Sequence, residues 1–358
     1  MNKIKTLLTV GATVAMLAIP VAAQNTTAPA NTSAPQGDCS QEAKDANYKI
    51  FRETLKSDQP KAYEAAKKYL ACPASATPTE AETKIVEYLT RWTKLYDEGS
   101  KKNKLTQLLY VDKKYAEAFA LGKEILAAEP EYVKGIVDLG ANGYLVAPLK
   151  NEQLTNDAVQ FARQGLQMLE SGKAPTEWGP LQNKDVATAY LNYTIGALTV
   201  EKDPAGALKH LIRSAQFETP LKKSAFTYAL IAGAYETGPY AKQSADYKAM
   251  YLGKDETPES KLALANINQL VDRMIDGYAR AVALAGADSN LATQKAAWQE
   301  NLTNLYKYRH ESETGLNEMI AGILAKPLPP EPTPLTSLPT PPATPAGTSG
   351  ATPNNGTG

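Results

Sequence analysis

Apolar residues recur at intervals of three or four along most of the chain, and alternating apolar and polar runs rich in Val, Ile and Thr are missing. Residues 260–286 show the pattern as one apolar stripe. Its members are Leu264, Ile267, Val271, Met274, Tyr278 and Val282. Because an α-helix turns once every ~3.6 residues, this spacing predicts helices that each bury one face. We therefore expect an all-α fold over residues 38–325.

Three places carry signals for the start of a helix. Thr79 with Glu82 matches a capping box. Asp203 and Thr257 each precede a proline, which is typical of an N-cap followed by the first helical residue. The connections between periodic segments are short, so neighbouring helices are expected to run antiparallel.

The stretch "YAEAFALGKEILAAEP" predicts a helix that begins at Tyr115 and ends before Pro130. Ala118, Gly122 and Ile125 lie on one face of this helix. Small side chains allow two helices to pack closely, and proline ends one helix and starts the next. The same pattern recurs at Ala158, Ala162 and Gly165, and again at Ala207, Leu211, Ser214 and Pro220.

These helices resemble the second helix of a tetratricopeptide (TPR) repeat, and two other segments resemble its first helix. The first-helix matches are Leu139, Gly140 and Tyr144 in "VKGIVDLGANGY", and Tyr228, Ile231, Ala232 and Tyr235 in "YALIAGAY". The resemblance covers residues 99–252 without a strict period, since longer turns interrupt it. It implies a TPR-like α-solenoid of stacked antiparallel hairpins with atypical ends. An irregular helical bundle without a groove is the alternative.

The resemblance also implies a concave surface, which first-helix residues line in this family and which holds a protein segment. Carried onto the two matched helices, the groove-facing positions are Lys134, Val137, Ala141, Tyr144, Phe226, Ala229, Gly233 and Glu236. The Lys and Asn clamp with which some members bind a terminal carboxylate is not recognisable there. We therefore expect a protein partner without a defined peptide specificity.

The two ends of the chain differ in composition from its body. Residues 1–23 begin with "MNKIK" and continue as an apolar run closed by Val21 and Ala23, which predicts a cleaved signal peptide and export to the periplasm or the medium. Residues 24–37 are small and polar, and are expected to be a disordered linker.

The C-terminal end is dense in proline. Residues 326–358 read "KPLPPEPTPLTSLPTPPATPAGTSGATPNNGTG", which predicts a polyproline-like disordered tail. A solvated spacer is the plain interpretation. The alternative is a ligand for a groove-bearing partner, because "PLPPEP" is already extended and loses little entropy on docking.

Cys39 and Cys72 are the two cysteines of the chain. Cys39 precedes one predicted helix and Cys72 ends the next, so an antiparallel hairpin brings both to the same end. An exported chain meets an oxidising compartment, and we therefore expect a disulfide between them. Two free thiols are the alternative.

The net charge of the chain does not favour any one class of binding partner. The chain has 38 basic and 38 acidic residues, so it has no overall bias toward nucleic acid or an acidic membrane. Its one basic cluster is expected to be a solvated helix face, and neither a nucleic-acid partner nor membrane insertion of the mature chain is predicted. The cluster comprises Lys101, Lys102, Lys104, Lys113 and Lys114.

Recognisable catalytic and cofactor motifs are missing from the sequence. The two histidines, His210 and His310, are far apart and not spaced for metal binding, and no phosphate loop, dinucleotide fingerprint or nucleophile elbow occurs. We expect no metal, no cofactor and no catalytic residues. The group Arg309, His310, Glu311 and Glu313 could supply a base with a carboxylate, but it is expected to be an exposed polar turn.

The function expected from the sequence is therefore a non-catalytic protein–protein interaction scaffold of the periplasm or cell envelope. A structural spacer that acts through the proline-rich tail is the second hypothesis. An enzyme without a recognisable motif is the third.

Overall fold

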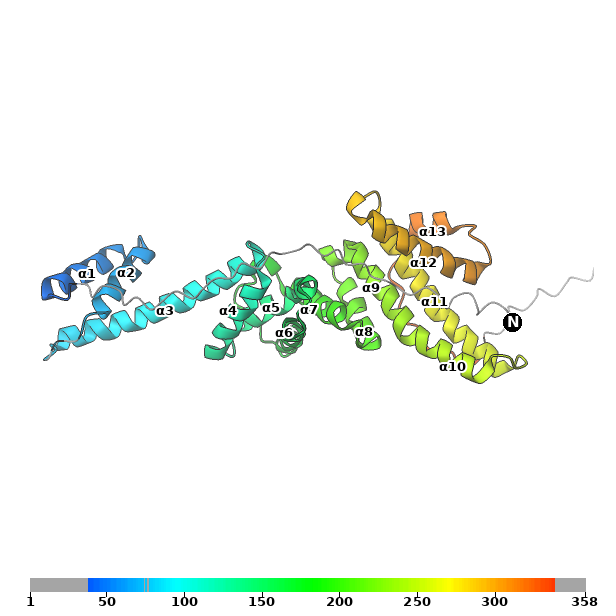
Figure 1. The fold of residues 1–358 in the computed structure, drawn as a ribbon, viewed down its shortest axis with the longest axis horizontal. Helices are drawn as coiled ribbons and strands as arrows, with labels where there is room; N and C mark the ends of the chain where they lie inside the picture. The colour runs from blue at the N-terminus through cyan, green and yellow to red at the C-terminus, as the bar shows by residue number, and fades with distance from the viewer. Residues whose placement is uncertain (1–37, 74, 76, 339–358) are drawn as a thin grey trace, which may run out of the picture. The chain divides into compact units, whose positions relative to one another are not determined.

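The computed structural model describes residues 38–73, 75 and 77–338. Within them the chain forms thirteen α-helices joined by turns, and no β-strand (Figure 1), so the all-α prediction is confirmed. None of these helices combines the length and apolar content needed to cross a membrane. The predicted signal peptide, linker and distal tail, residues 1–23, 24–37 and 339–358, lie outside the described residues.

The described chain divides into two compact units. Residues 38–325, which the sequence analysis treated as one repeat domain, are distributed over both. We call residues 38–201 with 209–222 the N-terminal unit, and residues 202–208 with 223–338 the C-terminal unit. The helices that begin before residue 210 are α1 Gln41–Thr54, α2 Gln59–Leu70, α3 Glu80–Tyr110, α4 Tyr115–Ala128, α5 Val133–Ala141, α6 Glu152–Glu170, α7 Lys184–Thr199 and α8 Pro204–Ala215.

The predicted helix starts are confirmed. Thr79 accepts a hydrogen bond from the backbone N–H of Glu82 at 3.2 Å, and Asp203 accepts from that of Gly206 at 2.9 Å. The Glu82 side chain does not complete a capping box, because its carboxylate pairs with the Lys44 ammonium instead. The complete box lies at Thr257, in reciprocal bonds with the N3 residue of α11.

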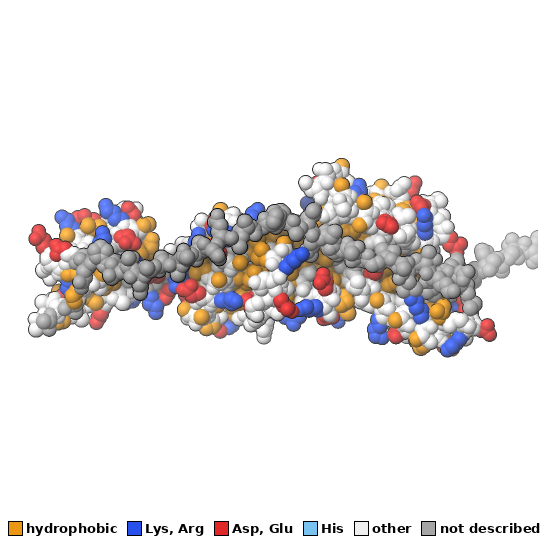
Figure 2. All heavy atoms as spheres, in the orientation of Figure 1, with side chains coloured by type: hydrophobic (Ala, Val, Ile, Leu, Met, Phe, Trp, Pro, Cys, Tyr) orange, Lys and Arg blue, Asp and Glu red, His pale blue; other side chains and the backbone are white. Residues whose placement is uncertain are grey.

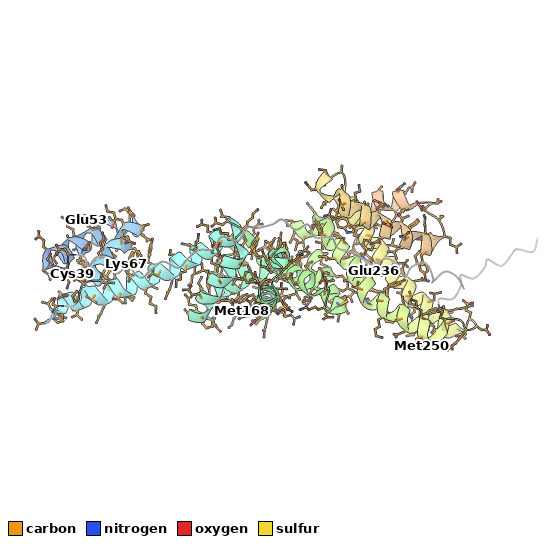
Figure 3. All side chains as sticks on the ribbon, in the orientation of Figure 1. Cys39, Glu53, Lys67, Met168, Glu236 and Met250 are labelled. Carbon is orange, nitrogen blue, oxygen red and sulfur yellow. A yellow bond between two sulfur atoms is a disulfide. The ribbon has the colours of Figure 1, made fainter. Side chains whose placement is uncertain are left out.

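A disulfide joins the open ends of the first hairpin. Cys39 precedes α1 and Cys72 follows α2, and the two are bonded with their Cα atoms 5.4 Å apart (Figure 3), which confirms the pairing expected from the sequence. Beneath them α1, α2 and α3 share a small core. Its buried members are Phe51, Ala62, Ala65, Ala66, Tyr69 and Leu89.

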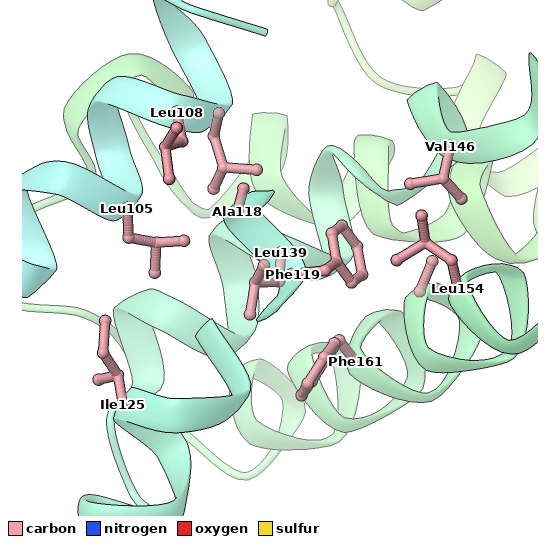
Figure 4. Close-up of a cluster of buried hydrophobic side chains, with 11 residues drawn as sticks. Leu105, Leu108, Ala118, Phe119, Ile125, Leu139, Val146, Leu154 and Phe161 are labelled. Carbon is pink, nitrogen blue, oxygen red and sulfur yellow. The ribbon is translucent and has the colours of Figure 1, made fainter. Parts of the chain in front are cut away.

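Helices α3 to α6 share a second core, in which Phe119 packs near Phe161 with ring centroids 6.0 Å apart (Figure 4). Small residues set the close approach of these helices, as the sequence predicted. A Cβ atom on Gly140 would lie 2.7 Å from the Ala162 Cα, and one on Gly122 would lie 2.5 Å from the Leu139 side chain. Larger residues at these glycines would force the helices apart.

The C-terminal unit is built around one long helix, α11 Pro258–Ala285. Helices α9, α10, α12 and α13 all pack against it (Figure 1). The apolar stripe predicted for α11 is buried, apart from Leu264, which is half-buried. The other helices are α9 Ala225–Tyr235, α10 Ala241–Tyr251, α12 Ala292–His310 and α13 Leu316–Gly322, and a π-helical turn, Glu236–Tyr240, joins α9 to α10.

Candidate functional site

The start of the proline-rich tail lies along α11. Residues 326–338, here called the tail segment, have no regular secondary structure, yet they are held by side chains of α11. The prediction of a disordered tail from residue 326 is therefore revised for this part. The composition correctly indicated a segment without helix or strand, but it could not show that a helix earlier in the chain binds its main chain.

Three polar side chains of α11 make these contacts, and we call Asn266, Arg273 and Arg280 the α11 ladder. Arg280 Nη2 donates to the carbonyl oxygens of Lys326 and Pro327, at 3.1 and 2.8 Å. The three residues are seven positions apart, which is close to two helical turns, so they lie on one side of the helix.

The other two residues of the α11 ladder, Arg273 and Asn266, bind the distal part of the tail segment. Arg273 Nε donates to the Pro330 carbonyl oxygen at 2.8 Å. Asn266 binds both main-chain groups of Leu335, because its Oδ1 accepts from the amide at 2.7 Å and its Nδ2 donates to the carbonyl at 3.2 Å. The tail segment therefore runs antiparallel to α11.

One side of the tail segment faces the protein. Leu328, Pro329, Pro332 and Leu335 are half-buried, whereas Glu331 and Pro334 are exposed. The step of three residues from Pro329 to Pro332 to Leu335 matches a polyproline II helix, which has about three residues per turn, and Leu328 adds a half-buried position next to Pro329. The tail segment thus presents one ridge of apolar side chains to the body of the unit and its carbonyl groups to the ladder.

Neighbouring side chains hold Arg280 and Asn266 in position. The Arg280 side chain is 5% exposed, and its guanidinium forms two hydrogen bonds with Asp276, at 2.7 and 3.3 Å. Asn266 accepts a further bond from Gln269 at 3.2 Å. These contacts restrict the Arg280 and Asn266 side chains independently of the tail segment, which reduces the entropy cost of binding.

A pocket of about 260 Å³ lies on another side of α11, between it and α10. Glu236 (Figure 3) lines this pocket and accepts a hydrogen bond from the Tyr278 hydroxyl at 2.9 Å. Burial raises the pKa of the Glu236 carboxyl above its ordinary range, and the Tyr278 hydrogen bond opposes this shift. Tyr240, Tyr247 and Tyr308 also line the pocket.

The raised pKa of Glu236 predicts a pH-dependent stability. Because the folded carboxyl binds its proton more tightly than the unfolded one, the free energy of unfolding should fall as pH rises through the window between the ordinary glutamate pKa and the raised one. Glu236→Gln should reduce this fall and be more stable than the parent at neutral pH, while the buried Asp138 carboxyl, whose pKa is also raised, keeps its own contribution. Urea unfolding across that window measures it, with exposed Glu300→Gln as the control. Parallel pH profiles for Glu236→Gln and the parent would contradict the prediction.

The groove positions carried over from the family resemblance near α5 are largely enclosed in the structure. Val137 and Ala141 are each 1% exposed and belong to a core cluster shared with α6 and α7, so a partner cannot contact them. Lys134 forms an ion pair with Asp138, and Tyr144 packs edge-on to Tyr193 at 5.1 Å. The physical reason is that α5 is enclosed, with every residue from 135 to 141 buried.

The second set of predicted groove positions lies in the C-terminal unit. Phe226 is 43% exposed and packs edge-on against Trp298 with ring centroids 5.5 Å apart. Ala229 and Gly233 are half-buried, and Glu236 lines the pocket beside α10. Of the eight positions proposed, Glu236 lines the pocket between α10 and α11.

The basic cluster near the end of α3 is compensated by carboxylates. Its ion pairs are Lys101 with Glu124 at 2.5 Å, Lys102 with Glu129 at 2.7 Å, Lys104 with Asp112 at 3.6 Å and Lys114 with Glu117 at 3.3 Å. On the face drawn in Figure 2, basic and acidic side chains are intermixed over the described residues. The cluster thus has the character of a solvated face, as the sequence indicated.

The suggested acid–base group has other contacts in the structure. His310 is exposed and lies against the Tyr306 ring with centroids 4.2 Å apart, while Glu313 pairs with Lys307 at 2.5 Å. Arg309 forms two hydrogen bonds with Asp272, at 2.6 and 3.1 Å. Among the described residues, no group of three or more His, Cys, Asp or Glu side chains is arranged to hold a metal ion.

Sequence reasoning missed the α11 ladder. Its signal was present, because Asn266, Arg273 and Arg280 repeat every seven residues beside the apolar stripe. Such polar residues are ordinarily solvated, so the repeat alone could not distinguish a binding face from a surface.

Comparisons of the chain with known protein families, with curated protein sequences and with solved structures gave no match. The resemblance to tetratricopeptide repeats therefore rests on the residues quoted above. A function is therefore inferred from the contacts of the described residues.

Proposed function

We propose that this protein is an exported, non-catalytic interaction scaffold that binds an extended, proline-containing segment of a protein partner along the α11 ladder. The observation that carries the proposal is the tail segment itself, whose main chain is held by Asn266, Arg273 and Arg280. The disulfide at Cys39 supports export, because such bonds persist in oxidising compartments.

Proline-containing segments suit this ladder for two physical reasons. Proline has no N–H, so such a segment presents many carbonyl acceptors and few donors. Arg273 and Arg280 offer only donors, which match those acceptors. A polyproline II segment is also extended before it binds, so it loses little conformational entropy on docking.

The chain's own tail segment is the intramolecular competitor for this site. A tethered segment has an effective concentration in the millimolar range for a short flexible connection, so a partner must bind more tightly than the tail or at a much higher local concentration. The spacer hypothesis is less favoured, since residues 326–338 are held against α11 and do not extend away from it.

Binding in trans tests the proposal. A chain that ends at Pro327 keeps both Arg280 contacts but lacks the rest of the tail, and should bind a labelled synthetic peptide of residues 326–338. Asn266→Ala with Arg273→Ala removes three hydrogen bonds of about 1 kcal/mol each, and should weaken this binding by on the order of 100-fold. Fluorescence anisotropy measures the affinity.

A matched control exchanges the same residue types elsewhere. Asn304 and Arg91 are exposed on α12 and α3, and replacing both with alanine should leave peptide affinity unchanged. Circular dichroism verifies that each variant is folded. Failure of the shortened chain to bind the peptide, or equal affinity in the ladder variant, would refute the proposed function.

A further inference from the structure

The pocket between α10 and α11 is separate from the α11 ladder and has its own chemistry. It is lined by Tyr240, Tyr247 and Lys248 on the side of α10, by Leu264 of α11 and by Tyr308 of α12, with Glu236 from the π-helical turn. Its volume of about 260 Å³ is close to the lower end for small-molecule sites.

Glu236 is the acidic residue among those that line this pocket, and its carboxyl interacts electrostatically with the Tyr240 phenol. Its carboxylate has the Tyr278 hydroxyl as a partner, and among the described residues no lysine or arginine forms an ion pair with it. Lys248 lines the same pocket but does not pair with this carboxylate. An ionised carboxylate in a buried site is costly unless a cation accompanies it.

The tyrosines make the pocket suitable for an ammonium group. Tyr308 interacts electrostatically with Tyr240 and Tyr247, which line the same pocket, and its hydroxyl donates a hydrogen bond to Asn268 at 3.2 Å. Their hydroxyl oxygens can accept hydrogen bonds, and the faces of their rings attract cations. Leu264 and Ile267 provide an apolar wall against which an alkyl chain can pack.

We propose that this pocket binds a primary alkylammonium group, with Glu236 as its counter-ion, the three tyrosines around its nitrogen and the apolar wall against its carbon chain. A free amine and a lysine side chain of a protein share this chemistry. The site goes beyond the proposed function, because none of its contacts involves the α11 ladder.

Titration calorimetry of the full-length chain with n-butylammonium tests the site. Binding should be at least ~10-fold tighter than that of 1-butanol or butyrate, which keep the alkyl chain but lose the positive charge. Glu236→Gln should weaken n-butylammonium binding by about 10-fold or more. Lys248→Ala removes a like charge and should strengthen it, a change that damage to the fold would not produce.

Further probes and variants separate the outcomes. Tighter binding of Nα-acetyl-lysine amide than of n-butylammonium would assign the site to a protein side chain, and the reverse order would assign it to a free amine. Asn266→Ala with Arg273→Ala should leave n-butylammonium affinity unchanged, so failure of peptide binding does not bear on this site. Absence of n-butylammonium binding, or equal binding by the Glu236→Gln variant, overturns the proposal.

Discussion

Replacing Arg280 with methionine is expected to lower the free energy of unfolding by about 3–5 kcal/mol. The Arg280 and Asp276 side chains are only 5% and 16% exposed, and Arg280 also donates to the Lys326 and Pro327 carbonyl groups. Methionine keeps much of the apolar stem but leaves the carboxylate without its cation and both carbonyl oxygens without this donor. Urea unfolding followed by circular dichroism measures the loss.

A second arginine–aspartate pair of the same unit provides the matched control. Arg309 and Asp272 also form two hydrogen bonds, but their side chains are 28% and 42% exposed. Arg309→Met should therefore cost about 0.2–1 kcal/mol, as exposed pairs ordinarily do. Equal losses in the two variants would show that burial does not decide the stability of these pairs.

Removing the disulfide should have the second large effect. The bond closes a loop with a sequence separation of 33 residues, and the chain-entropy model gives roughly 3–4 kcal/mol for a loop of this length. Cys39→Ser with Cys72→Ser should lower the unfolding free energy by that amount. Trp92 packs against Phe51 at 5.0 Å in the core of this hairpin, so tryptophan fluorescence during urea unfolding reports the change.

Reductant provides the internal control for this prediction. It should destabilise the parent chain as much as the double substitution does, and it should have no effect on the double variant. Identical unfolding of the oxidised and reduced parent would mean that the bond does not contribute to the stability of the folded hairpin.

Local features of the fold were predictable from the sequence. Periodicity gave the helices, and the caps at Thr79, Asp203 and Thr257 gave their first residues. The close approach at Gly122 followed from its missing side chain. These features depend on neighbours within a few turns of the chain, so the sequence contains them directly.

Features that depend on distant partners were not predictable. "VKGIVDLGA" is apolar or small almost all round, so its sequence could not show that α5 is enclosed and that Val137 and Ala141 are core residues. The tail segment was expected to be solvated because its binding partners lie far away in the chain, up to 69 residues from Leu335. Glu236 was selected for a repeat groove, and the sequence did not indicate the pocket that it lines with residues of α10 and α11.

Recognition through the main chain has a consequence for how the tail can change. Every residue type carries the carbonyl oxygen that Arg273 and Arg280 bind, so substitutions at exposed positions such as Glu331 leave the ladder contacts in place. Insertion of one residue between Pro330 and Leu335 would instead shift every later carbonyl group out of register. The α11 ladder therefore recognises the spacing of carbonyl groups in the tail segment. Substitutions in the tail segment should disturb its binding far less than insertions or deletions.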